Sequence, residues 1–137
     1  MSVALDQLIP HRAPMQWINN LTGCTDTTAT ATACFGEIDF AVADGNVLET
    51  ALVECVAQTV AAALGQRAQA GGGKTGLAAN GMLVAVSNFK IQARPPAGKT
   101  LHIEIREVRR LGLMLLIAGT ISCGGQTVAS GELSLYA

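Results

Sequence analysis

The chain has 137 residues, with nine basic and ten acidic side chains and a net charge of −1. Its length predicts a single domain over residues 1–137, because domains most often hold about 100–150 residues. Half of the sequence is hydrophobic and only 14% is charged, which excludes a disordered chain and favours a surface shared with a second subunit.

The first part of the chain predicts two strands. Residues 1–14 hold a short apolar segment followed by a Pro-flanked corner, and residues 17–21 form a first candidate strand. Residues 25–35 alternate threonine with alanine, which is typical of a strand with one buried face. Residues 36–46 then form an acidic connection that contains glycine.

One long helix follows from Val47 to about Ala70. This stretch has no proline, has glycine only at Gly65, and is rich in residues that favour helix. Its apolar positions cover nearly all sides, which predicts a helix buried on most faces. Asn46 is the expected N-cap, and the glycines at 71–73 are the expected terminator.

The remainder of the chain predicts four more strands, over residues 83–91, 100–108, 111–122 and 127–136. Turn signals at residues 95–98 and 123–126 separate some of them. Two strands, one helix and four strands indicate an α+β fold. A six-stranded antiparallel sheet wrapped around a central helix would bury that helix on most sides.

Several classes of function are not expected. The scattered basic residues provide no patch for nucleic acid. The uncharged stretch 111–131 is too interrupted for a membrane span, and residues 1–6 do not resemble a signal peptide, which predicts a cytoplasmic protein. The four cysteines and two histidines are too dispersed for a zinc site, so no metal or cofactor is expected.

Glu54 is the strongest candidate for chemistry. It is the only charged residue between Glu49 and Arg67 in the helix, and Gln58 lies one turn later on the same face. A carboxyl group in an apolar wall can serve as a general acid or base. The alternative is a glutamate at a helix edge that is solvated or paired across a subunit interface.

Two further residues are weaker candidates. His11 lies in the Pro-flanked corner, where it could act as a base or could anchor the corner through a backbone hydrogen bond. Asp44 lies in the connection that leads into the helix. It could orient a water there, although acidic residues near a helix N-terminus are also favourable to the helix dipole.

Three motifs in the same order resemble those of the hotdog-fold 3-hydroxyacyl-[acyl-carrier-protein] dehydratases. Residues 10–14 (PHRAP) are similar to the family's P-H-R-x-P segment, and residues 54–58 (ECVAQ) match its E-x-x-A-Q helix signature. Residues 88–90 and 95–98 resemble its F-K…P…P-G-D region. The resemblance implies a lyase of fatty-acid-type biosynthesis, in which two subunits pair with their helices side by side and the sites lie between them.

The chain departs from the family at two points. Phe40, fourteen residues before Glu54, stands where the family has its catalytic histidine, and Leu48-Glu49 replaces a Pro-Gly pair that opens the family's helix. In the family the histidine removes a C2 proton, the acid assists departure of the hydroxyl, and N–H groups of the helix N-terminus hold the thioester oxygen. The resemblance implies a substrate site bordered by Phe40, Asp44, Leu48, Glu49 and Gln58.

The sequence is most similar to a divergent branch of these dehydratases, some of which are associated with aryl-polyene pathways. Three functions stay open. The chain could be a dehydratase in which Glu54 acts beside another base, such as His11 or a partner's residue. It could be a non-catalytic hotdog subunit that completes a partner's site. It could also be a thioesterase in which Glu54 or Asp44 positions water.

The resemblance also implies the partners of the chain. These are an acyl carrier protein or a CoA thioester, together with a second hotdog subunit. That subunit could be a copy of this chain, in a homodimer or a higher homo-oligomer, or a related chain in a hetero-oligomer.

Overall fold

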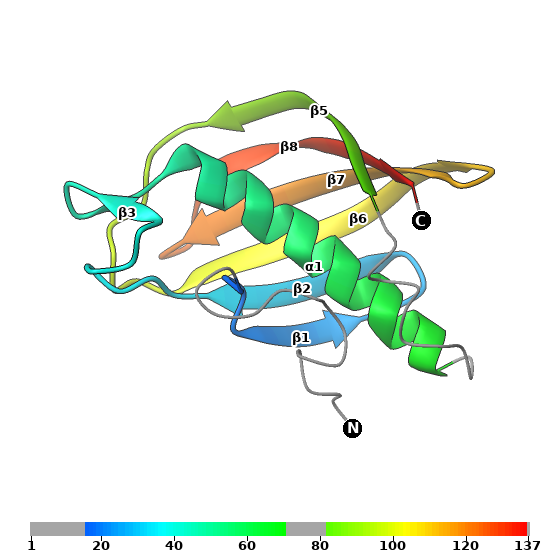
Figure 1. Ribbon diagram of the computed structural model, residues 1–137, viewed down its shortest axis with the longest axis horizontal. Coiled ribbons are helices and arrows are strands. Elements are labelled where there is room, and N and C mark those ends of the chain that lie inside the picture. Colours follow the sequence, from blue (N-terminus) through cyan, green and yellow to red (C-terminus); the bar gives the residue numbers. More distant parts are fainter. Residues whose placement is uncertain (1–15, 71–81, 137) are drawn as a thin grey trace.

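The computed structural model describes residues 16–70 and 82–136, and Figure 1 shows their arrangement. One antiparallel sheet contains six strands in the order β1-β2-β6-β7-β8-β5. Their bounds are Asn20–Cys24 (β1), Thr28–Ala33 (β2), Met82–Ile91 (β5), Leu101–Leu111 (β6), Met114–Cys123 (β7) and Gln126–Tyr136 (β8). The predicted sheet of six antiparallel strands with one long helix is therefore confirmed.

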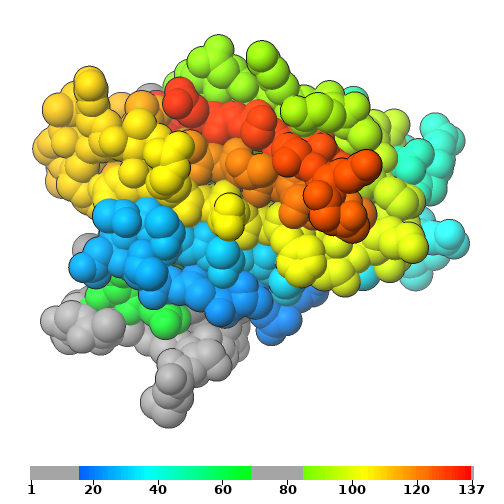
Figure 2. Space-filling model, turned by 180° about the vertical axis from the view of Figure 1, so that it is seen from behind, coloured from blue at the N-terminus to red at the C-terminus, as the bar shows by residue number. Residues whose placement is uncertain are grey.

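Helix α1 (Glu49–Ala70) crosses one face of this sheet and contacts β1, β2, β5, β6 and β7. Figure 2 shows the opposite face, where side chains of β2, β6, β7 and β8 form the surface. The helix face toward the sheet is fully buried, for example at Leu52 and Val56. Another stripe of the helix is apolar but only half-buried in this chain; it comprises Val53, Ala57, Ala61 and Leu64.

The core between helix and sheet is built mainly from aliphatic side chains, many of them alanines. In β2 the alanines Ala29, Ala31 and Ala33 are buried, while the alternating threonines face outward. In β7 an added Cβ at Gly119 would lie 2.5 Å from Cγ1 of Val56 on the helix. The scarcity of aromatic residues in the sequence thus corresponds to a close approach of helix and sheet.

The N-terminal strands begin later than the sequence predicts. Trp17 precedes β1 because its N–H donates to the side chain of Gln58 (2.9 Å) rather than to a strand. β2 begins at Thr28 because residues 25–28 form a turn, closed by a bond from the Thr25 N–H to the Thr28 carbonyl (2.8 Å). β6 also runs past its predicted end to Leu111, through a bulge between Glu107 and Arg109.

The predicted connection over residues 36–46 contains most of a small hairpin. Strands β3 (Val42–Ala43) and β4 (Asn46–Val47) pair across Asp44-Gly45, whose φ values of 54° and 79° fit a type I′ turn. The prediction of Asn46 as N-cap is wrong, because Asn46 pairs with Ala43 in this hairpin. The helix begins at Glu49, and the carbonyl of Leu48 accepts its first bonds.

Across residues 16–70 and 82–136, no helix combines the length and the hydrophobicity that crossing a membrane requires.

Candidate active site

Glu54 lies near the start of α1, half-buried beside the apolar stripe. The Nε2 group of Gln58 donates a hydrogen bond of 3.3 Å to Oε2 of Glu54. The two side chains therefore meet on one helix face, as their spacing of four residues predicts. A carboxyl group in this position is shielded on part of its surface by hydrocarbon and is held by a neighbouring amide.

Gln58 is fully buried and fixes the orientation of this pair. Its Oε1 accepts hydrogen bonds from the backbone N–H groups of Trp17 (2.9 Å) and Ile18 (3.3 Å). Because a backbone N–H can only donate, the amide oxygen must face those groups and the NH₂ group must face Glu54. Oε2 of Glu54 is therefore a hydrogen-bond acceptor, and Gln58 lies behind it in the protein interior.

An aromatic cluster contains the residue at the expected histidine position. The ring of Trp17 packs edge-on against Phe35 (centroids 6.0 Å apart) and against Phe40 (5.8 Å apart). Phe35 is buried, whereas 56% of Phe40 is exposed. A phenyl ring cannot accept a proton, so this position provides an apolar surface instead of a base. Trp17 was not predicted as part of the site, although it is the one tryptophan of the sequence.

The other expected site residues lie at the N-terminus of α1 and in the hairpin that precedes it. Leu48 is half-buried, and its N–H donates to the Ala41 carbonyl (2.8 Å). The N–H groups of Glu49 and Thr50 precede the first intrahelical donor, Ala51, as expected at a helix start. Asp44 is exposed at the tip of the β3–β4 hairpin, where its positive φ makes it part of the turn.

Arg94 is a further residue of this region, and sequence reasoning missed it. Its guanidinium donates to the carbonyls of Ala43, Asn46 and Val47 at 2.9–3.1 Å. Its Nε also lies 3.7 Å from Oε1 of Glu49. These partners are more than 40 residues away in the sequence, so no local pattern could have identified them.

Other chemistry near Glu54 is restricted. Burial, and to a lesser extent the adjacent Glu54 carboxylate, raises the pKa of the Cys55 thiol to about 12, so this thiol is not a nucleophile at neutral pH. Within the described ranges, no group of three His, Cys, Asp or Glu side chains could hold a metal ion. His11 and the corner at residues 10–14 lie outside the described residues.

A six-stranded antiparallel sheet around one long helix is the hotdog architecture, and comparison with solved structures supports this assignment. The structure of the dehydratase heterocomplex ApeI:P from Xenorhabdus doucetiae is similar with a TM-score of 0.88 and 20% identity, over 99% of this chain and 91% of that chain. A hypothetical thioesterase with coenzyme A from Streptococcus pneumoniae has a TM-score of 0.66 and 13% identity, over 85% and 83%. The PaaI protein of E. coli has a TM-score of 0.68 and 12% identity, over 86% and 82%.

The family is identified from the sequence. The family model named ApeP-like, described as ApeP dehydratase, matches residues 3–137, and the chain belongs to this family. No protein among the curated proteins matches the chain. The predicted hotdog fold and the predicted relation to dehydratases are therefore both confirmed.

Proposed function

We propose that this chain is the acid-bearing subunit of a 3-hydroxyacyl-thioester dehydratase, and that a related hotdog subunit provides the histidine base. One observation carries the proposal: Glu54 is held by buried Gln58 on an apolar helix face, whereas Phe40 occupies the position expected for the base. Membership of the ApeP-like dehydratase family supports it. The likeness in fold to a dehydratase heterocomplex supports a partner of the same fold.

The reaction divides between the two subunits. The partner's histidine takes the proton from C2, Glu54 gives a proton to the hydroxyl on C3, the C3–O bond breaks, and water leaves as the C2=C3 double bond forms. N–H groups at the N-terminus of α1, those of Glu49 and Thr50, bind the thioester oxygen as negative charge develops on it. Phe40 and Trp17 form an apolar wall beside the reacting carbons.

The half-buried stripe of Val53, Ala57, Ala61 and Leu64 is where the partner's helix packs in this proposal. It is an apolar surface of the kind that subunits cover when they associate. The substrate is an acyl group carried as a thioester by an acyl carrier protein or CoA, in an aryl-polyene-type pathway in the cytoplasm.

The test measures dehydration by the chain alone, by its partner hotdog subunit alone, and by the two together. With a 3-hydroxyacyl thioester as substrate, enoyl absorbance is expected to appear rapidly only with the pair. Glu54→Gln in this chain should lower the kcat of the pair by about 10²–10⁴-fold, the range for loss of an acid–base group. Glu104→Gln is the matched control, because Glu104 is exposed on β6 and its change should leave the rate unaltered.

Three outcomes would contradict the proposal. The first is a Glu54→Gln pair as active as the unchanged pair. The second is a chain that dehydrates the substrate equally well without its partner. The third is release of free thiol without enoyl formation, which would indicate a thioesterase.

A further inference from the structure

We propose that Arg94 is a positioning residue that holds the N-terminus of α1 in place for the thioester oxygen and offsets the charge of Glu49. The inference rests on the proposed function, because it assigns a role to the same helix terminus. Arg94 does not touch substrate in this assignment. It acts through the β3–β4 hairpin and through the first turn of the helix.

Arg94 lies in the connection between β5 and β6, and its contacts join that connection to the helix entry. Its Nη2 donates to the carbonyls of Ala43 (2.9 Å) and Asn46 (3.1 Å), one in each strand of the hairpin. Its Nε donates to the carbonyl of Val47 (3.1 Å), two residues before the helix begins. Hydrogen bonds from a charged donor are about twice as strong as neutral ones, so this side chain fixes the hairpin firmly.

The backbone around Arg94 reinforces the same attachment. The Val47 N–H donates to the Pro95 carbonyl (2.8 Å), and the Ala97 N–H donates to the Gly45 carbonyl (2.9 Å). Leu48, immediately before the helix, has no side-chain oxygen to cap it, unlike the residues usually found there. The helix start is therefore positioned by the hairpin and by Arg94 rather than by a side-chain cap.

Glu49 makes the charge of Arg94 important. A carboxylate in the first turn is favourable to the helix dipole, but it repels the negative charge that develops on a thioester oxygen at the same terminus. Oε1 of Glu49 lies 3.7 Å from Nε of Arg94, and the Glu49 side chain is 57% exposed. The guanidinium compensates the carboxylate there, so that a second negative oxygen can bind nearby.

The first experiment measures kcat and KM of the pair for four variants of this chain. Arg94→Met is expected to lower kcat about 100-fold, since small misplacements of reacting groups cost factors of this size. Arg94→Lys, which keeps the charge with fewer bonds, should lose about tenfold. The double variant Arg94→Met/Glu49→Gln should recover about tenfold over Arg94→Met, a recovery that a purely structural role would not produce.

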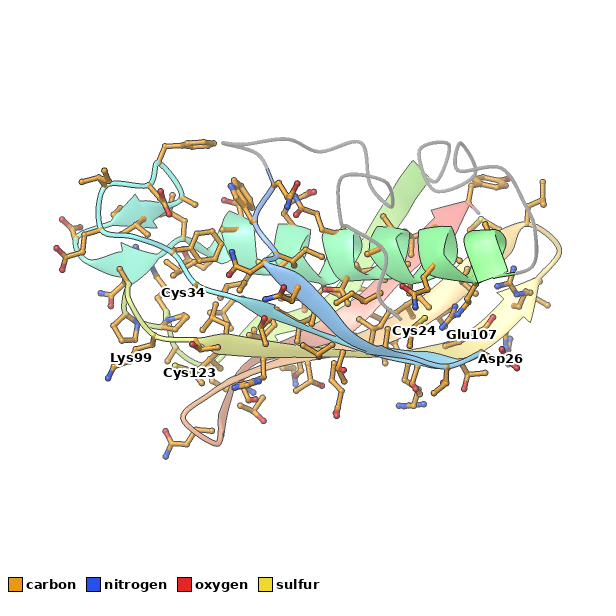
Figure 3. All side chains as sticks on the ribbon, turned by 90° about the horizontal axis from the view of Figure 1, so that it is seen from below. Cys24, Asp26, Cys34, Lys99, Glu107 and Cys123 are labelled. Carbon is orange, nitrogen blue, oxygen red and sulfur yellow. The ribbon has the colours of Figure 1, made fainter. Side chains whose placement is uncertain are left out.

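Arg110→Met is the matched control for an exposed arginine. Arg110 pairs with Glu107 (2.9 Å), and Figure 3 shows Glu107 toward the end of the molecule where α1 ends, far from its start. This control should keep the full rate. The inference would be overturned if the subunit pair containing Arg94→Met kept an unchanged kcat, or if the double variant were no faster than Arg94→Met.

A second measurement needs no turnover. Amide hydrogen exchange of the chain alone should be at least tenfold faster in Arg94→Met at Val47 and Leu48, and intermediate in Arg94→Lys, with Arg110→Met unchanged. If the unchanged pair shows no dehydration, the proposed function is wrong, and exchange still decides whether Arg94 holds the helix entry. Unchanged exchange in both Arg94 variants would refute that role.

Discussion

Gly119 lies on β7 where the sheet meets the helix, and we expect that its replacement by alanine destabilises the fold. A Cβ at this position would lie 2.5 Å from Cγ1 and 3.3 Å from Cγ2 of Val56. The optimal separation of non-bonded carbon atoms is about 3.5–4.0 Å, so Val56 or the helix must move by about 1 Å. Val56 is fully buried and cannot rotate into solvent, and it is two residues from Glu54.

Overpacking of a core by one methyl group typically costs 1–3 kcal/mol, and we expect a loss of about 2 kcal/mol in the free energy of unfolding. Urea denaturation measures it. Val56→Ala alone should cost about 1.5–2 kcal/mol, because it removes two buried methyl groups. In the double variant Gly119→Ala/Val56→Ala the new methyl group fills part of the vacated space, so the combined loss should fall below the sum by about 1–2 kcal/mol.

Two outcomes would refute this reasoning. Stability of Gly119→Ala within about 0.5 kcal/mol of the unchanged chain, the usual range for surface changes, would mean that the contact is not tight. Additive losses in the double variant would mean that the two sites are not coupled.

Two further predictions concern Cys55 and Phe40. The pKa of the Cys55 thiol is raised from 9.0 to about 12 in the folded chain, so the folded state keeps a proton that the unfolded state loses. The contribution of the protonated thiol to the stability of the folded state is complete below pH 9. It is lost as the pH rises toward 12, by up to about 1.4 kcal/mol per pH unit. Urea denaturation between pH 9 and 12 should show the free energy of unfolding falling with pH, and the fall should be less steep in Cys55→Ala. An equal pH dependence in the two chains would contradict the raised pKa of Cys55. Phe40→His should give the chain alone measurable dehydration of a 3-hydroxyacyl thioester, followed by enoyl absorbance, whereas the control Phe40→Leu should give none. If Phe40→His gains no dehydration activity, Phe40 does not occupy the position of the base.

The regular elements were predictable because each repeats a local pattern. In β6, Leu101, Ile103 and Ile105 alternate with His102 and Glu104, and the structure buries the first set and exposes the second. The helix was predictable from its long stretch without proline, and most of the residues that it buries are apolar, with Gln58 and Thr59 as buried polar exceptions. The alternating burial of a strand and the extent of a helix depend on residues that are neighbours in the sequence, so both can be predicted from the sequence.

The helix entry was not predictable in the same way. Strands of two residues, such as β3 and β4, are too short for an alternating pattern, although Asp44-Gly45 is a recognised signal of a type I′ turn. Asn46 has the right side chain for an N-cap, but pairing with Ala43 takes it into the hairpin. Arg94 acts on carbonyl groups brought close by the tertiary fold, and its role depends on distances that no sequence window contains.

The Glu54–Gln58 pair separates a structural role from a chemical one. Gln58 has a structural function, because its Oε1 accepts the N–H groups of Trp17 and Ile18 and so holds the segment before β1. Its buried NH₂ group then needs an acceptor, since an unsatisfied buried donor costs about 1–3 kcal/mol. An amide oxygen at position 54 would also meet that need. The bond to Gln58 therefore does not require the acid, and Glu54→Gln is the change that keeps the acceptor while it removes the proton that the proposed dehydration uses.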